Sequence, residues 1–101
     1  MLKAKKSLSQ NFLVDKNIFK KIVNQTSIKN EYILEIGPGY GILTDMILKK
    51  KPKKIYLIEK DTELSKYLKI KYKSLENIII INEDILKFDL NNKEKFVIVS
   101  N

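Results

Sequence analysis

Short apolar runs recur along the chain, separated by segments with helical periodicity, and this alternation limits the possible folds more than any other feature. The runs are continuous rather than alternating, which is typical of strands buried on both faces. They occupy residues 32–36, 55–58, 77–82 and 96–99. The pattern therefore predicts an α/β fold with a parallel sheet, built from right-handed βαβ units and covered on both faces.

Helices are predicted before and between these runs. Asp15 is expected to cap the first, Ile42 to Lys50 to form the second, and Asp61 to cap the third. Apolar residues at helical spacing would face the sheet, namely Ile18, Phe19, Ile22, Val23, Leu43, Met46, Ile47, Leu64, Tyr67, Leu68 and Tyr72. The 101 residues suffice for one core. Because no element follows the last run, we expect the chain to be part of a doubly wound domain.

The composition excludes several classes of function. The sequence has no cysteine and no histidine, so we expect no disulfide, thiolate chemistry or metal site. No apolar run approaches the roughly 20 residues of a membrane span, and residues 1–13 lack the apolar core of a signal peptide. We therefore expect a cytoplasmic protein with no membrane segment.

The basic excess indicates an anionic partner. The net charge is +8 and all 20 basic residues are lysine. Nucleic acid is the first candidate for such a partner. An AT-rich genome would give the same lysine-rich composition without selection for RNA, and charge alone does not separate RNA from an anionic membrane surface.

The most informative local motif is E-I-G-P-G-Y-G, from Glu35 to Gly41, between a predicted strand and a predicted helix. Glycines at such a turn let the backbone bend tightly and approach a ligand. Glu59 closes the next strand 20 positions after Gly39. A carboxylate at that position accepts hydrogen bonds from ribose hydroxyls in nucleoside-binding folds. Glycines also serve ordinary turns, but the turn, the helix and the acid together favour an adenosine-containing cofactor.

The order of the glycines argues against a nicotinamide dinucleotide. The fingerprint for that cofactor is G-x-G-x-x-G, whereas this motif is G-x-G-x-G with Pro38 inside it. Glu35 would be a poor neighbour for a pyrophosphate and a good one for a cationic ligand. A sulfonium cofactor with an amino-acid ammonium group fits that charge pattern better.

Two further segments leave alternatives open. Asp84 follows the third strand, where its carboxylate could accept from an adenine amine or simply cap a short turn. The run from Lys5 to Leu13 precedes the first predicted helix, and Asn11 within it could close over a ligand. The alternative interpretation is a frayed polar terminus.

Taken together, these segments resemble the bacterial-type small-subunit ribosomal RNA adenine N6-dimethyltransferases, an S-adenosylmethionine-dependent family. The shared motifs are K-S-L-S-Q-N-F-L, E-I-G-P-G-Y-G-I-L-T, L-I-E-K-D, N-E-D-I-L and V-I-V-S-N, in the family's order from Lys6 to Asn101. The resemblance implies a Rossmann-like class I methyltransferase fold whose first four strands have the order 3-2-1-4. It also implies that residues 1–101 are the amino-terminal part of the cofactor-binding domain, without its remainder or the helical domain that follows.

The resemblance also implies roles for individual residues. Asn11 and Leu13 correspond to residues that lie over the cofactor, although Ser9 stands where the family commonly has glycine. Gly37 corresponds to a glycine whose backbone contacts the cofactor. Glu59 corresponds to the acid that holds the ribose hydroxyls, and Asp84 to the carboxylate on the adenine amine.

Asn101 corresponds to the first residue of the family's N-[LI]-P-Y motif, and so to both a catalytic and a cofactor-binding position. In that motif the asparagine and proline carbonyls accept from the target amine while an aromatic ring stacks on the base. The proline and the aromatic residue lie beyond the sequence. The 101 residues are therefore expected to bind the cofactor without methylating RNA.

The expected activity of the parent enzyme is dimethylation of N6 on two adjacent adenines near the 3′ end of small-subunit ribosomal RNA. The implied cofactor is S-adenosylmethionine, and the implied partner is that RNA or the pre-30S particle, bound by a monomer. The main alternative is a non-catalytic RNA- or DNA-binding module of the same fold, whose binding would depend on salt and need no cofactor. A third hypothesis is that the chain is a fragment of an NAD-dependent oxidoreductase.

Overall fold

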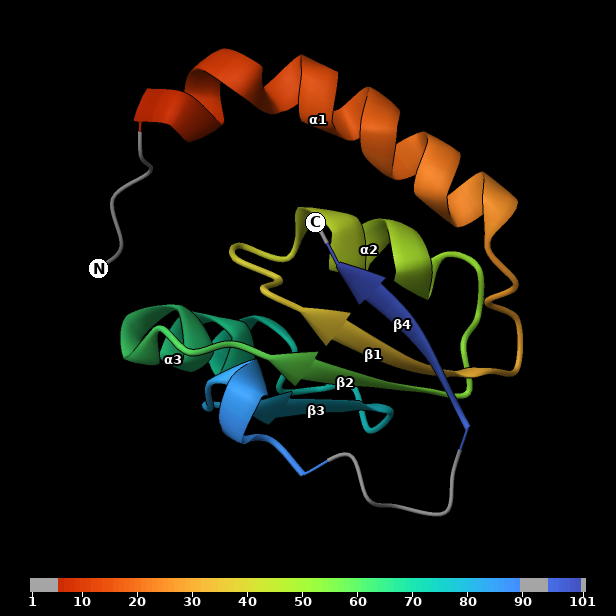
Figure 1. Cartoon of the computed structure of the whole chain (residues 1–101), viewed down its shortest axis with the longest axis vertical. Coiled ribbons are helices and arrows are strands. Elements are labelled where there is room, and N and C mark those ends of the chain that lie inside the picture. Colours follow the sequence, from red (N-terminus) through yellow and green to blue (C-terminus); the bar gives the residue numbers. More distant parts are fainter. Residues whose placement is uncertain (1–5, 90–94, 101) are drawn as a thin grey trace.

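A computed structural model describes residues 6–89 and 95–100 of the chain (Figure 1). Helices and strands alternate through these residues, as the sequence predicted. The elements are α1 (Lys6–Gln25), β1 (Tyr32–Ile36), α2 (Ile42–Leu48), β2 (Lys54–Ile58), α3 (Thr62–Lys71), β3 (Ile78–Ile81), the 3₁₀ turn η1 (Ile85–Lys87) and β4 (Phe96–Ser100).

The strands form one parallel sheet in the order β3-β2-β1-β4. This confirms the predicted order 3-2-1-4. β1 is a central strand, and its register pairs Leu34 with Tyr56 of β2 and with Ile98 of β4. Because all strands run the same way, the residues that follow β1, β2 and β3 meet along a single edge of the sheet.

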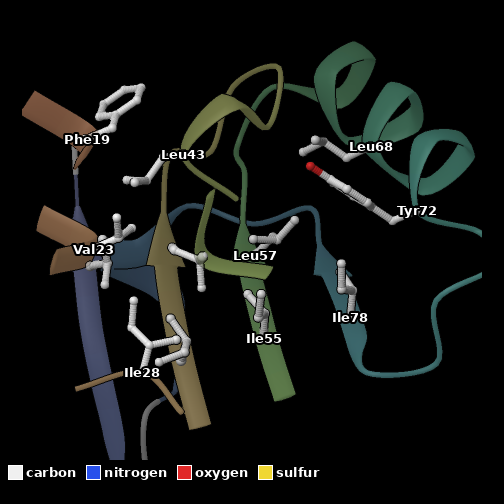
Figure 2. Close-up of a cluster of buried hydrophobic side chains, with 12 residues drawn as sticks. Phe19, Val23, Ile28, Leu43, Ile55, Leu57, Leu68, Tyr72 and Ile78 are labelled. Atoms are coloured by element: carbon white, nitrogen blue, oxygen red, sulfur yellow. The ribbon is translucent and has the colours of Figure 1, made fainter. Parts of the chain in front are cut away.

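The core lies between one face of the sheet and the helices. Ile33, Ile55 and Ile78 are adjacent in register on this face, and each is buried. α1, α2 and α3 all add side chains to the same cluster, as Figure 2 shows for Phe19, Val23, Leu43, Leu68 and Tyr72. The three described helices therefore cover the same face of the sheet.

That arrangement differs from the expected sheet with helices on both faces. From β1 to β2 to β3, each strand is added on the same side of the one before. Right-handed crossovers between strands added in one direction place their helices on the same face of the sheet. Helices reach the other side only when the strand order reverses, which happens between β3 and β4. Within the described residues, that connection holds only the short turn η1.

The opposite face carries aromatic residues near the amino-terminal ends of the strands. The ring of Phe96 makes edge-to-face contacts with Tyr32 at 6.4 Å and with Tyr56 at 5.2 Å between centroids. Ile98 on the same face of β4 is 55% exposed. Part of this face is therefore apolar and in contact with solvent.

The start of α1 corrects the sequence-based prediction. The helix begins at Lys6, not after Asp15. Leu8 and Phe12 extend the same apolar spacing that continues through Phe19 and Val23. An aspartate within a helix costs at most about 0.7 kcal/mol, so a potential capping residue does not force a helix to begin.

The start of α3 agrees with the prediction. Asp61 is the N-cap, and its Oδ1 accepts a hydrogen bond from the backbone N–H of Leu64 at 3.0 Å. Leu68 and Tyr72 are buried, as expected, but Tyr67 is 38% exposed. Tyr67 packs edge-to-face against Tyr40 instead, with ring centroids 5.6 Å apart.

Candidate functional site

A glycine-rich turn follows β1 at the carboxyl edge of the sheet. Gly37, Gly39 and Gly41 have φ angles of +67°, +60° and +87°, which residues with a Cβ rarely adopt. A Cβ added to Gly37 or Gly39 would meet nothing within 4 Å, whereas one added to Gly41 would overlap the hydroxyl of Tyr72. The backbone at Gly37 and Gly39 is therefore open to a ligand, while Gly41 is required for packing within the protein.

Glu59 directly follows β2 and contacts this turn. Its Oε1 accepts from the backbone N–H of Gly39 at 3.1 Å, and its Oε2 accepts from that of Asp61 at 3.0 Å. The residue is only 6% exposed. The structure thus brings the predicted glycine turn and the predicted acid, which are 20 positions apart, into direct contact.

The segment after β3 lies next to Glu59 along the same edge. The backbone carbonyl of Glu59 accepts from the N–H of Glu83 at 3.1 Å and from Asn82 Nδ2 at 3.0 Å. Asp84 comes next, and its Oδ1 accepts from the N–H of Leu86 at 3.0 Å. The capping role for Asp84 is therefore confirmed, and contact with an adenine stays a prediction.

Glu35 occupies a different environment from the one the sequence suggested. It lies on the helix-covered face of β1, is 1% exposed, and accepts a hydrogen bond from the Thr44 hydroxyl at 2.6 Å. Burial raises the pKa of Glu35 from 4.5 to about 7, and the hydrogen bond from Thr44 offsets only part of this effect. The carboxyl group therefore keeps its proton to a higher pH than an exposed glutamate does. Glu35 should therefore attract a cationic ligand more weakly than the sequence predicted.

The sequence did not predict a polar cluster at the end of the turn, around Tyr40, Gly41 and Asp45. Lys71 Nζ donates to Asp45 Oδ2 and to the Tyr40 carbonyl, both at 2.9 Å. Tyr72 Oη donates to Asp45 Oδ1 at 2.6 Å and lies 3.1 Å from the Gly41 carbonyl oxygen. These partners are 26 to 31 positions apart in sequence. No local pattern could have paired them.

For the other predicted site residues, Asn11, Leu13 and Asn101, the structure gives at most the secondary-structure element. Asn11 and Leu13 lie in α1 rather than in a segment before the first helix. Asn101 lies outside the described residues. The roles of all three in cofactor binding or catalysis stay predictions.

The described residues contain neither a candidate metal site nor a candidate membrane span. Nowhere in residues 6–89 and 95–100 do three or more histidine, cysteine, aspartate or glutamate side chains lie where they could hold a metal ion. None of the helices in those ranges is both long and apolar enough to cross a membrane. A surface hollow of about 370 Å³ lies beside Val23, Ser27 and Lys50, at the opposite edge of the sheet from the glycine turn.

The sequence matches one family of known proteins over its whole length. Residues 1–101 match the family described as ribosomal RNA adenine dimethylase. The ribosomal RNA small subunit methyltransferase A of Pelagibacter ubique is 58% identical over 86 residues, which are 85% of this chain and 32% of the relative. The chain spans about a third of the length of the curated relatives it matches.

Solved structures agree with the sequence match. A dimethyladenosine transferase from Plasmodium falciparum superposes with a TM-score of 0.72 at 30% identity, covering 84% of this chain and 31% of that one. The 23S rRNA methyltransferase ErmE superposes with a TM-score of 0.71 at 28% identity, covering 83% of this chain and 34% of that one. The chain therefore has the Rossmann-like fold of these methyltransferases and belongs to the ribosomal RNA adenine dimethylase family.

Proposed function

We propose that this chain forms the cofactor-binding part of an S-adenosylmethionine-dependent methyltransferase that dimethylates adenine N6 in small-subunit ribosomal RNA. The contact between Glu59 and Gly39 carries the proposal. It places a carboxylate beside an open stretch of glycine backbone, at the edge where parallel α/β sheets bind nucleosides. Membership of the dimethylase family supports the choice of reaction.

The residues at this edge fit the proposed cofactor. Each oxygen of Glu59 accepts one backbone N–H and keeps a lone pair that could accept from a ribose hydroxyl. The turn at Gly37 and Gly39 has no side chain to obstruct a bound ligand. Asp84, next along the edge, would accept from the adenine amine through the oxygen that does not cap η1.

The chemistry needs little from the protein beyond binding and orientation. A bound S-adenosylmethionine would supply an activated methyl group. The adenine N6 lone pair would form the new N–C bond while the S–C bond breaks, leaving a neutral thioether, and the proton on nitrogen would pass to solvent, so the transfer requires no strong base. By resemblance, the amide carbonyl of Asn101 would accept from the target amine and direct its lone pair toward the methyl group. The target adenine must leave its stack to reach the site, which calls for an aromatic surface to receive it.

The partner that we propose is small-subunit ribosomal RNA, alone or in the pre-30S particle, in the cytoplasm. Two observations support it. The matched curated relatives are ribosomal RNA small subunit methyltransferases by name. The net charge of +8 suits a phosphate backbone. We also propose that residues 1–101 by themselves bind the cofactor but leave RNA unmethylated, because Asn101 is the one residue of the family's catalytic motif among them.

Calorimetric titration with S-adenosylmethionine tests this proposal. We expect binding to the wild-type chain and none of NADH. Glu59→Gln should weaken the binding about tenfold or more, because hydrogen bonds to a charged acceptor are stronger than those to a neutral one. Glu63→Gln is the matched control, since Glu63 is an exposed residue in the first turn of α3.

Two results would contradict the proposal. A folded chain, as judged by circular dichroism, that binds no S-adenosylmethionine would remove the cofactor assignment. Salt-dependent RNA binding that persists in Glu59→Gln without any cofactor binding would favour the non-catalytic nucleic-acid module.

A further inference from the structure

Two side chains at the end of α3 contact the glycine turn at the two residues that follow the one contacted by Glu59. Lys71 Nζ donates to the backbone carbonyl of Tyr40 and to the carboxylate of Asp45, each at 2.9 Å. Asp45 lies in the first turn of α2, directly after the glycine turn. Lys71 therefore ties the turn and the beginning of α2 to the end of α3.

Tyr72 makes a second connection at the same place. Its buried hydroxyl lies 2.6 Å from Asp45 Oδ1 and 3.1 Å from the carbonyl oxygen of Gly41. Burial, together with the hydrogen bond and charge of Asp45, raises the pKa of Tyr72, so the hydroxyl keeps its proton and remains a donor. The close approach is possible only because Gly41 has no Cβ.

The two ends of one continuous segment thus bind successive residues of the turn. At its beginning, Glu59 accepts from the N–H of Gly39. At its end, Lys71 donates to the carbonyl of Tyr40, and the Tyr72 hydroxyl lies 3.1 Å from the carbonyl oxygen of Gly41. Midway along α3, the ring of Tyr67 packs on the ring of Tyr40.

We propose that Lys71 and Tyr72 are positioning residues that hold residues 39–41 in the conformation that binds the cofactor. This inference rests on the proposed function, since it assigns these side chains to the same site. Neither residue lies on the open side of the turn, so their effect acts through the backbone. Glycine loses more conformational entropy on ordering than any other residue. A turn already fixed in the free protein therefore binds its ligand more tightly.

Affinity for S-adenosylmethionine in matched variants tests the inference. Tyr72→Phe keeps the ring and removes the hydroxyl, and Lys71→Met keeps most of the side-chain length and removes the ammonium group. Each should raise the Kd about fivefold, close to 1 kcal/mol at 25 °C. Lys69→Met on the exposed side of α3 should leave the Kd unchanged.

Two additional measurements separate positioning from general stability. Unfolding curves would fix a temperature at which every variant is fully folded, so that lost stability alone would not change the Kd. Lys71→Arg keeps the charge and the donors and should restore affinity to within about twofold of wild type. Because Lys71 is partly exposed, its variants are expected to fold even if Tyr72→Phe does not.

The outcomes distinguish this inference from the proposed function. Wild-type binding with unchanged Kd values in folded Lys71→Met and Tyr72→Phe would overturn the inference alone. An equal loss of affinity in Lys69→Met would also overturn it, since the effect would then come from net charge. No binding to the folded wild-type chain would overturn the proposed function and the inference with it.

Discussion

At the scale of single residues, the buried carboxyl group of Glu35 is the most unusual feature of the chain. It lies directly before the glycine turn, on the strand that occupies the centre of the sheet. In the described part of the chain the Thr44 hydroxyl donates to it, and one such hydrogen bond is little compensation for the loss of water around a charge. The folded protein therefore favours the protonated form.

This burial predicts a characteristic pH dependence of stability. The pKa of Glu35 rises from 4.5 to about 7 on folding, so between these pH values the folded state binds more protons than the unfolded state. The free energy of unfolding should therefore fall as the pH rises through this window, by up to about 3 kcal/mol, and level off above it. Urea unfolding of wild type and Glu35→Gln from pH 4 to 8 would measure the effect.

The informative quantity is the difference between the two unfolding curves. Other carboxylates contribute equally to both proteins and cancel. A difference that stays constant from pH 4.5 to 7 would show that folding does not raise the pKa of Glu35. Glu63→Gln, at an exposed position, should match wild type throughout.

The glycines of the turn should differ in their sensitivity to substitution. Gly39→Ala introduces only a strained φ and should cost about 1–2 kcal/mol of unfolding free energy. Gly41→Ala adds a steric overlap with the Tyr72 hydroxyl and should cost more. In a Tyr72→Phe background the additional cost should shrink, because the overlapping atom is gone. Denaturant unfolding of wild type, the three single variants and the Gly41→Ala/Tyr72→Phe double variant checks this, and equal costs for the two glycines would contradict it.

At the scale of secondary-structure elements, α3 depends on its N-cap residue. Asp61 accepts the N–H of Leu64, and its own N–H donates to Glu59. Asp61→Ala should lower the free energy of unfolding by about 1 kcal/mol, whereas Asp61→Ser should keep most of the cap. Circular dichroism during urea titration would measure both. Equal losses in the two variants would show that the cap contributes nothing.

The elements also show where prediction from sequence worked. The strands β1, β2 and β3 and the cap of α3 were predicted to within one residue, because period and capping chemistry are local. The predicted start of α1 was wrong by ten residues, because a single favourable capping residue was given more weight than a continuing apolar spacing. Tyr67 was wrongly assigned to the core, since helical spacing does not show that Tyr40 lies nearby.

At the scale of the whole molecule, helices cover one face of the sheet, while part of the other face and the outer edge of β4 are exposed in the described residues. In the described part of the chain, β4 pairs only with β1, and Ile98 on it is 55% exposed. Exposed apolar edge strands promote pairing with other chains. We predict that the 101-residue polypeptide, expected to be a monomer when dilute, associates reversibly as its concentration rises.

Sedimentation velocity over a range of concentrations would test this prediction. Ile98→Lys should reduce the association while changing the free energy of unfolding by less than about 1 kcal/mol, because the side chain is already exposed. Ile70→Lys is the matched control, since Ile70 is 69% exposed but lies on α3. Equal effects of the two substitutions would indicate general hydrophobic association rather than pairing through the sheet edge.

Some features of the candidate site could be predicted from the sequence and others could not. The glycine turn, the acid after β2 and the acid after β3 could be predicted, because parallel strands necessarily bring their carboxyl ends to one edge. Their contact with a cofactor remains a prediction. The contacts of Lys71 and Tyr72 with the glycine turn could not be predicted. They join residues 31 positions apart, and they depend on how α3 packs beside the turn.

The sequence by itself determined the parallel sheet, its turn chemistry and the family, because these follow from local periodicity, backbone conformation and short motifs. Only the tertiary structure decided that the described helices cover one face, that Glu35 is buried with a raised pKa, and that α3 holds the glycine turn. The reason is that burial and long-range hydrogen bonds depend on which elements pack together. Residue spacing along the chain does not encode that information locally.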